Sequence, residues 1–123
     1  MPSGYPPYSG YSGGGGSGGS GGPILVPGVV FLATPAGTPY AVTATDGAIF
    51  MDATGGNGIV NLPAATDRRE ITVKNSAAAA VLNTVAVTPN GAETIDSVAG
   101  ARLYTGTQGI TLVGRTGVGW YIT

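Results

Sequence analysis

The chain of 123 residues has room for one domain, and 9% of its residues are charged, against about 25% in an ordinary soluble domain. It contains neither cysteine nor histidine, which excludes disulfides, thiolate or imidazole metal sites, a cysteine nucleophile and a Ser-His-Asp triad. The net charge is -1 and the cations are scattered apart from Arg68–Arg69, so the basic patch typical of nucleic-acid binding is missing.

Residues 1–22 form a low-complexity arm of Gly, Ser, Pro and Tyr after the first Met. Such a composition cannot bury enough apolar area to offset its ordering entropy, so we expect the arm to be disordered when alone. Tyr5, Tyr8 and Tyr11 recur at intervals of three, which aligns their rings in a polyproline-type conformation. The arm is therefore either a solvated linker or a segment whose tyrosines dock on a neighbouring protein.

Residues 23–39 form an apolar connecting segment, in which Pro27-Gly28 interrupts the run from Ile24 to Leu32. Proline within the run favours an edge strand or two short pieces over a core strand. The run either packs on its own domain or contacts a second copy or another protein, and its candidate contact residues are Ile24, Leu25, Val26, Val29 and Phe31.

Neither the arm nor the apolar run suggests a membrane protein. The arm lacks the basic start and apolar core of a signal peptide, and the run is shorter than the about 20 residues of a membrane span. We therefore expect a cytoplasmic product without a membrane partner.

From Tyr40 onward, short alternating segments are separated by Gly, Asn, Asp and Pro, as in β-strands joined by turns. The pattern predicts that residues 40–123 form an all-β module, a compact antiparallel sandwich or barrel-like module of about 8–10 short strands. No repeat longer than one strand-turn unit is evident. The helix candidate is Ala77–Leu82, with Ser76 as its possible cap, and it is short enough to be a single turn. The expected strands are Tyr40–Thr45, Ala48–Ala53, Gly58–Leu62, Glu70–Asn75, Leu82–Thr88, Glu93–Asp96, Arg102–Tyr104, Gly109–Val113 and Gly119–Thr123.

Alternation within these strands also predicts the core. Trp120 is expected to close it, with a sugar- or partner-binding role as the alternative for this ring. The other residues expected to point inward are Val42, Ile49, Met51, Ile59, Leu62, Ile71, Val73, Val85, Val87, Ile95, Leu103, Ile110, Leu112 and Ile122.

Few side chains suggest chemistry. Asp46 and Asp67 fall at predicted turns, where Asp bonds its own backbone. Asp52, Glu93 and Asp96 lie in or beside strands and are the candidates for a cation site or an acid–base pair. The spacing of a calcium loop is missing, so we assign no metal, no cofactor and no catalytic residue.

The densest charge cluster is Asp67-Arg68-Arg69-Glu70. It is either a solvated loop or a contact between subunits, in which Arg68, Arg69 and Glu70 form ion pairs across the interface.

The order VTATDGAIFMDATGG, IVNLPAATDRREITVKN, VAVTPNGAETIDS and ITLVGRTGVGWYI resembles small β-modules of bacteriophage virion proteins. Such modules occur in tail fibres, head fibres and capsid decoration proteins. The resemblance covers about residues 40–123 and implies a module that commonly forms a homotrimer and has a structural or binding role. It carries over no catalytic residue.

One short module without a shaft favours a capsid decoration (cement) protein, which binds the major capsid protein lattice through the arm and stabilises the shell. The alternative is a receptor-binding tail-fibre or spike tip. Both hypotheses place the protein in the virion after synthesis in the host cytoplasm. In both, its partners are virion proteins and further copies of itself, and we expect neither nucleic-acid binding nor an enzymatic activity. A polysaccharide depolymerase using Asp52, Glu93 and Asp96 is a third class.

Overall fold

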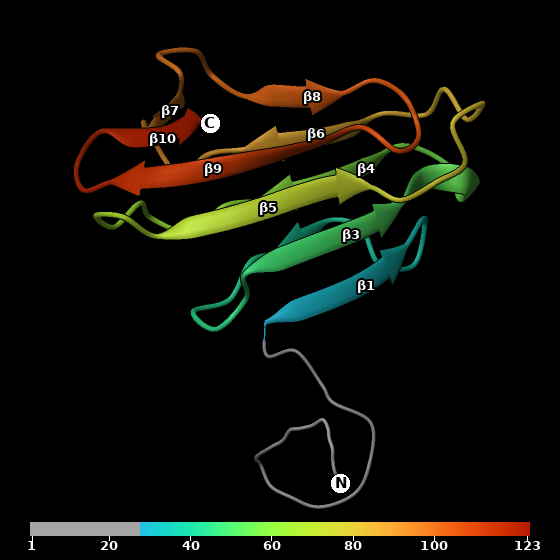
Figure 1. Ribbon diagram of the computed structural model, residues 1–123, viewed down its shortest axis with the longest axis horizontal. Helices are drawn as coiled ribbons and strands as arrows, with labels where there is room; N and C mark the ends of the chain where they lie inside the picture. The colour runs from blue at the N-terminus through green and yellow to red at the C-terminus, as the bar shows by residue number, and fades with distance from the viewer. Residues whose placement is uncertain (1–27) are drawn as a thin grey trace, which may run out of the picture.

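The computed structural model describes residues 28–123, which form two β-sheets around one core (Figure 1). Strands make up 45% of the described residues, which contain no α-helix, so this part of the fold is nearly all β. A short 3-10 helix, η2 (Ala53–Gly55), follows the third strand. The strands are β1 (Val29–Ala33), β2 (Tyr40–Ala41), β3 (Ala48–Asp52), β4 (Gly58–Asn61), β5 (Glu70–Asn75), β6 (Val85–Thr88), β7 (Thr94–Ile95), β8 (Ala101–Leu103), β9 (Gly109–Arg115) and β10 (Gly119–Ile122).

The first six strands alternate between the two sheets. Sheet A has the strand order β1-β3-β5-β9-β10-β7, and sheet B has the order β2-β4-β6-β8. Strands β1, β3 and β5 are parallel to one another, as are β2, β4 and β6. The chain thus visits both sheets once in each coil of about 20–25 residues, in a solenoid-like arrangement.

The last four strands close this arrangement. β8 runs antiparallel to β6, β9 antiparallel to β5, and β10 antiparallel to β9, while β7 pairs parallel to β10. The expectation of an antiparallel module is therefore wrong for β1–β6, and the sheets are mixed. Alternation and turn residues look the same whether consecutive strands pair with each other or cross to the opposite sheet, which is why the sequence did not distinguish the two.

Rows of apolar residues cross the strands and form the core. In sheet A, Val30 lies opposite Ile49, Ile49 opposite Val73, and Val73 opposite Ile110. In sheet B, one such row joins β4, β6 and β8 through Val60, Val87 and Ala101. Because each coil adds one residue to each row, stacking the coils buries a continuous apolar interior.

Most of the predicted core residues are buried, and Trp120 closes the core at 1% exposure, as expected. Ile59 and Ile122 are exceptions with 42% and 39% exposure. On β4, Gly58 already points inward, since a Cβ there would lie 2.9 Å from Cγ of Met51. Val60 therefore shares the inner face with Gly58, and the expectation for Ile59 is wrong.

The strand positions agree with the sequence more closely than the strand pairing does. β5 has the predicted bounds, whereas the predicted strand Tyr40–Thr45 shrinks to the two residues of β2. At Ala77–Leu82 there is no helix, only a turn in which Val81 N donates to Ala78 O at 2.9 Å. The apolar segment before Tyr40 supplies β1, which lies at the edge of sheet A, as the proline argument predicted for the part that is described.

Candidate functional site

Five of the six carboxylates accept hydrogen bonds from backbone N–H groups. These bonds hold loops and strand ends, so the carboxylates stabilise the fold locally. The pairs are Asp46 with Thr43 N at 2.8 Å, Asp52 with Thr54 N at 3.0 Å, Asp67 with Thr116 N at 2.9 Å, Glu93 with Ala65 N at 3.0 Å, and Asp96 with Ile122 N at 3.1 Å.

The candidate acid–base residues are engaged at separate places. Both carboxylate oxygens of Glu93 accept from the N–H of Ala65, at 3.0 and 3.3 Å, and this ties the loop before β7 to the loop after β4. Asp96 bonds the backbone of β10. Within residues 28–123, no group of three or more His, Cys, Asp or Glu side chains could hold a metal ion.

Asp46 is buried at the centre of a polar cluster in the loop between β2 and β3. Its Oδ2 accepts from the hydroxyl of Tyr40 at 2.7 Å and from Thr43 N at 2.8 Å, while Nη2 of Arg69 donates to the carbonyls of Thr43 at 2.6 Å and Asp46 at 2.9 Å. Burial alone would raise the pKa of Asp46, but the bonds from Thr43 and Tyr40 and the charge of Arg69 together lower it.

The same cluster affects Tyr40, whose pKa is raised by its hydrogen bond to Asp46, by burial and by the negative charge of that carboxylate. At the end of β3, hydrogen bonds from the hydroxyl and the N–H of Thr54 lower the pKa of Asp52. In this position Asp52 caps η2. The raised pKa keeps Tyr40 protonated, so that its hydroxyl can donate to Asp46, and the lowered pKa keeps Asp52 ionised, so that it can accept from Thr54.

Asn75 is a structural polar residue that the sequence analysis missed. It is fully buried at the end of β5, where its Oδ1 accepts from Ala53 N at 3.4 Å and Ala77 N at 3.2 Å, and its Nδ2 donates to Asn83 O at 3.0 Å. Asn83 in turn donates to the carbonyl of Ala53 at 2.8 Å. The sequence did contain a signal for this role, because Asn75 falls in the same alternating register as Ile71 and Val73, which point inward.

The cluster predicted as a subunit contact is divided between two uses. Arg69 bonds two carbonyls of its own chain through Nη2 and so holds the loop between β2 and β3. Arg68 and Glu70 are exposed, and Arg68 has a left-handed backbone with a φ of 65°. The structure thus gives Arg69 a role within the chain, and the subunit contact stays a prediction.

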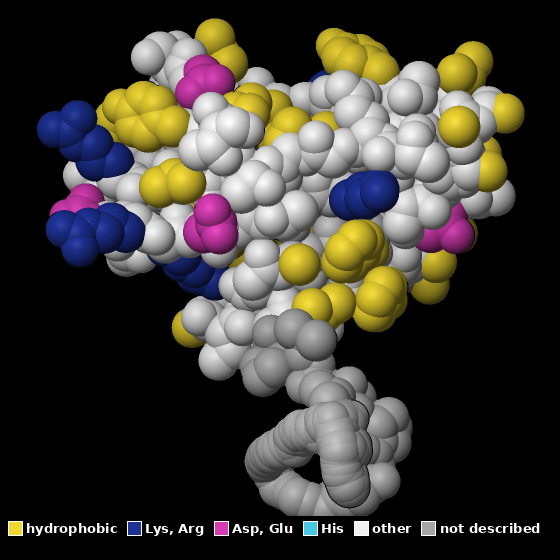
Figure 2. Space-filling model, viewed as in Figure 1, with side chains coloured by type: hydrophobic (Ala, Val, Ile, Leu, Met, Phe, Trp, Pro, Cys, Tyr) yellow, Lys and Arg dark blue, Asp and Glu magenta, His cyan; other side chains and the backbone are white. Residues whose placement is uncertain are grey.

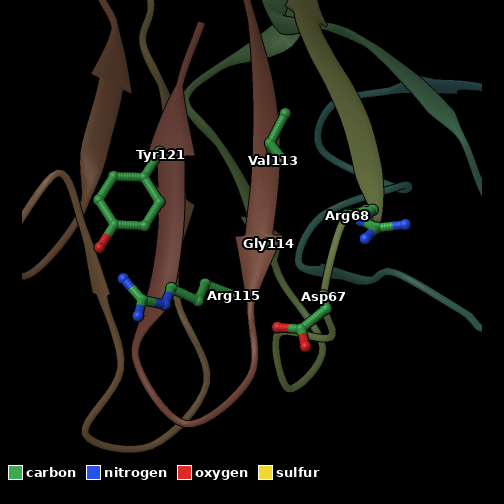
Figure 3. Close-up of a pocket in the computed structure, with 6 residues that line it drawn as sticks. All are labelled: Asp67, Arg68, Val113, Gly114, Arg115 and Tyr121. Carbon is green, nitrogen blue, oxygen red and sulfur yellow. The ribbon is translucent and has the colours of Figure 1, made fainter.

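An open hollow of about 540 Å³ lies where the β9–β10 hairpin meets the loop before β5 (Figure 3). Tyr121 and Arg115 line one side, and Asp67 and Arg68 line the other, with Val113 between them. The side chain of Arg115 extends toward Tyr121, whereas Arg68 points away from the centre. An aromatic face beside a guanidinium and a carboxylate is an arrangement that can bind polar ligands.

A second exposed feature lies on β1. Phe31 is 76% exposed and stacks on Phe50 of β3, with a distance of 5.1 Å between the ring centroids and 18° between the ring planes. Figure 2 shows apolar side chains along the lower part of the face in view. Of the predicted contact residues, Val29 and Phe31 lie on β1, whereas Tyr5, Tyr8, Tyr11, Ile24, Leu25 and Val26 lie outside the described residues.

Comparison with protein-family models, curated proteins and solved structures found no match. A search of residues 28–123 for membrane spans found no helix of sufficient length and apolarity.

Proposed function

We propose that this protein is a structural component of a virion, a capsid decoration protein that binds the major capsid protein lattice and stabilises the shell. The observation that carries the proposal is the open edge of β1, an uncharged strand with an exposed aromatic ring. Such an edge offers both backbone hydrogen-bonding groups and apolar surface to another protein chain. We therefore infer that the module works as part of an assembly.

The use of the carboxylates supports a role in binding. Asp52, Glu93 and Asp96, the candidates for a depolymerase, each accept a backbone N–H of a loop or strand end. In this arrangement their charge stabilises the fold, and no two of them share a hydrogen-bonding partner. We propose that they support a rigid module and take no part in a reaction.

The arm is assigned the capsid contact. Tyr5, Tyr8 and Tyr11 would supply large apolar rings with a polar tip, which suit wet interfaces between proteins. An arm that adds contacts to those of the module raises avidity without a larger module. A homotrimer on the lattice would use the exposed Arg68 and Glu70 as its subunit contact, while Arg69 holds its own chain.

Binding to capsids that lack the protein tests this function. The intact chain should cosediment with such capsids and raise their melting temperature, because a protein that binds the assembled shell stabilises it. A variant with Tyr5, Tyr8 and Tyr11 replaced by Ser should bind at least about tenfold more weakly, a loss of about 1.4 kcal/mol. Unchanged capsid binding by this variant would overturn the assignment of the arm, and absence of binding by the intact chain would overturn the capsid role.

The hollow beside Tyr121 favours a second candidate, a receptor-binding tip of a tail fibre or spike. Its tyrosine, guanidinium and carboxylate could contact a glycan or a host protein. In that case the isolated protein should bind host cells or their surface polysaccharide, and Tyr121→Ala should weaken this binding. Retention on capsids without any binding to cells would decide for the decoration protein.

A further inference from the structure

We propose that two copies of the chain pair through β1, antiparallel and centred on Phe31, so that sheet A continues from one copy into the other. The inference deepens the proposed assembly role by naming a second copy as the partner at this edge. It rests on the proposed function only in taking the edge of β1 as a surface that binds another protein chain. It requires neither a capsid nor the arm, so each proposal can fail without the other.

The backbone of β1 directs alternate residues to the open edge. Thr34 N donates to Asp52 O, and Gly28 O accepts from the N–H groups of Gly47 and Ala48, so the even-numbered positions face β3. In an extended strand, successive residues turn their N–H and C=O groups to opposite sides. The odd-numbered residues therefore present theirs to the edge, and these residues are Val29, Phe31 and Ala33.

Within the described residues, the outward groups of Val29 and Phe31 are free, whereas Gly37 of the following turn lies against Ala33. β3 is the one strand beside β1 within residues 28–123, and the carbonyl of Ala33, which accepts from Gly37 N at 2.8 Å, has a partner in the following turn. The N–H and C=O groups of Val29 and Phe31 lie on the side without a neighbouring strand. A row of unpaired groups of this kind is a template for another strand.

Strand β1 can pair with a second copy of itself. β1 has five residues with Phe31 at the centre, so a second β1 running antiparallel places Phe31 opposite Phe31 of the second copy and Val29 opposite Ala33. Phe31 presents both backbone groups to the edge, so the two copies of Phe31 form a pair that exchanges two hydrogen bonds. A two-fold contact of this kind is closed, which is the commonest symmetry of soluble oligomers.

The side chains on both faces fit the same register. On the inner face, Val30 and Leu32 pack against the core but are only half-buried, because no further strand within the described part of the chain covers them. Antiparallel pairing puts Val30 opposite Leu32 of the second copy and completes their burial. On the outer face, the stacked Phe31 and Phe50 would be continued by the same two rings of the second copy, and aromatic cross-strand pairs stabilise sheets.

The other sheet edges are protected, whereas β1 has no such protection within residues 28–123. Beside β2, the N–H of Thr43 donates to Asp46 and its carbonyl accepts from Arg69, so side chains occupy the backbone groups just past the strand. β7 and β8, the opposite edges of the two sheets, have two and three residues. Short strands and charged side chains are the usual protection of an edge, and β1 has neither.

A second copy is a better occupant of this edge than the residues that precede it. The segment 13–22 is Gly and Ser alone and has no apolar residues to continue the inner rows. Ile24–Val26 is joined to β1 by only Pro27-Gly28. A Pro-Gly pair favours a type II turn, and such turns splay paired strands.

Cysteine cross-linking tests the register directly, because the chain has no cysteine of its own. In a pair centred on residue 31, the two Cα atoms are about 5.5 Å apart, within the range that a disulfide spans. We expect the full-length Phe31→Cys variant to form a disulfide-linked dimer on mild oxidation. Val29→Cys and Ala33→Cys should cross-link efficiently when mixed with each other and poorly when oxidised alone. Tyr104→Cys, on another exposed position, should stay uncross-linked.

Sedimentation of the full-length protein gives the independent measurement. The wild-type chain should be dimeric or a higher even-numbered oligomer, and Phe31→Lys should raise the dissociation constant at least about tenfold by placing two charges opposite each other. When both are monomeric, the variant should lose no more than about 1 kcal/mol of unfolding free energy, the contribution of the stack of Phe31 on Phe50, since Phe31 is otherwise exposed in the single chain. A wild-type monomer at high concentration, or an oligomer in which Phe31→Cys does not cross-link, would overturn the pairing. Capsid binding measured on Phe31→Lys then shows whether the proposed function stands separately.

Discussion

The two halves of the module, β1–β6 and β7–β10, share the same two sheets but are built by different rules. In the first half each strand pairs with the strand two positions along the chain, always in parallel. In the second half β8 and β9 turn back antiparallel onto β6 and β5, and β10 returns along β9. A stack of coils has two ends, and within residues 28–123 the second half covers one of them while β1 stays at the other.

This difference shows which interactions each half needs. In the parallel half, the chain crosses from one sheet to the other at the ends of the strands, which we call the corners. The first half therefore depends on buried polar groups at these corners, above all on Asn75. The closing half must stay attached to coils that are distant in sequence, and it does so by contacts such as Glu93 with Ala65 and Asp67 with Thr116. Substitutions at the two kinds of contact should therefore differ in size.

The largest effect is expected at the corner of the first half. Asn75→Leu keeps the approximate volume but leaves the N–H groups of Ala53 and Ala77 and the carbonyl of Asn83 without their partner in a buried place. Each buried unsatisfied group costs about 1–3 kcal/mol, so we expect a loss of about 4 kcal/mol in the free energy of unfolding. Urea unfolding measures it.

The matched control is Asn61, an exposed asparagine on β4. Asn61→Leu should change the free energy of unfolding by no more than about 0.5 kcal/mol. If both variants lose the same amount, the corner network is not what stabilises the coils.

The closing half should be most sensitive where β10 meets β7. Gly119 has a φ of 141°, and a Cβ there would lie 2.2 Å from Thr94 O. Gly119→Ala must separate the two strands, and we expect a loss of about 3 kcal/mol. Gly117 also has a positive φ of 76°, but no atom lies within 4 Å of its Cβ position.

Gly117→Ala therefore isolates the cost of the backbone conformation, about 1 kcal/mol. The difference between the two variants in thermal or urea unfolding is the cost of placing a Cβ between β7 and β10, together with the greater backbone cost at the φ of Gly119. Equal losses would mean that close approach of these strands contributes nothing.

The sequence predicted the strands but not their partners. Glu70–Asn75 was predicted because its alternation is regular, and the edge position of Val29–Ala33 agrees with one of the two alternatives for the apolar run that Pro27 interrupts, an edge strand or two short pieces. Pairing depends on where the chain goes after each turn, and a coil that crosses to the opposite sheet leaves the same pattern of residues. Gly58 adds a second difficulty, since an inward position without a side chain is invisible to a search for apolar alternation.

The roles of the carboxylates were predicted only in part. Asp46 bonds the backbone of its own turn at Thr43, as expected, whereas Asp67 lies at a turn but bonds the distant Thr116 N, so the local bond expected for it is wrong. Glu93 and Asp96 bond residues far along the chain, Ala65 and Ile122, and no spacing in the sequence reveals such contacts. The hollow beside Tyr121 was missed for the same reason, because separate segments line it.

A third prediction concerns the open end, where Asp46 holds the loop after β2. The fold lowers the pKa of Asp46, so its ionised form stabilises the folded chain at pH values above the usual pKa of about 3.9, and this contribution is lost as the pH falls through the folded value. Asp46→Asn should cost about 1.5 kcal/mol at pH 7, since it removes a charged acceptor.

The difference in unfolding free energy between wild type and Asp46→Asn should shrink as the pH is lowered below about 4. Tyr40→Phe, which removes one of the donors to Asp46, should make a smaller difference of the same sign. A wild-type advantage over Asp46→Asn that stays constant down to pH 3 would contradict a role for the charge.

The smallest effect is expected at the contact that joins the halves across the loops. Glu93→Ala removes the acceptor of Ala65 N, in a place that is only partly buried, and should cost about 1 kcal/mol. Glu93→Gln keeps an acceptor and should recover part of this loss. Hydrogen exchange locates the effect, because the amide of Ala65 should exchange faster in Glu93→Ala while the amides of β3 and β5, in the middle of the parallel coils, keep their protection relative to the global stability. Uniformly faster exchange across both halves would instead mean that this contact stabilises the whole module, and the two halves would then unfold as one unit.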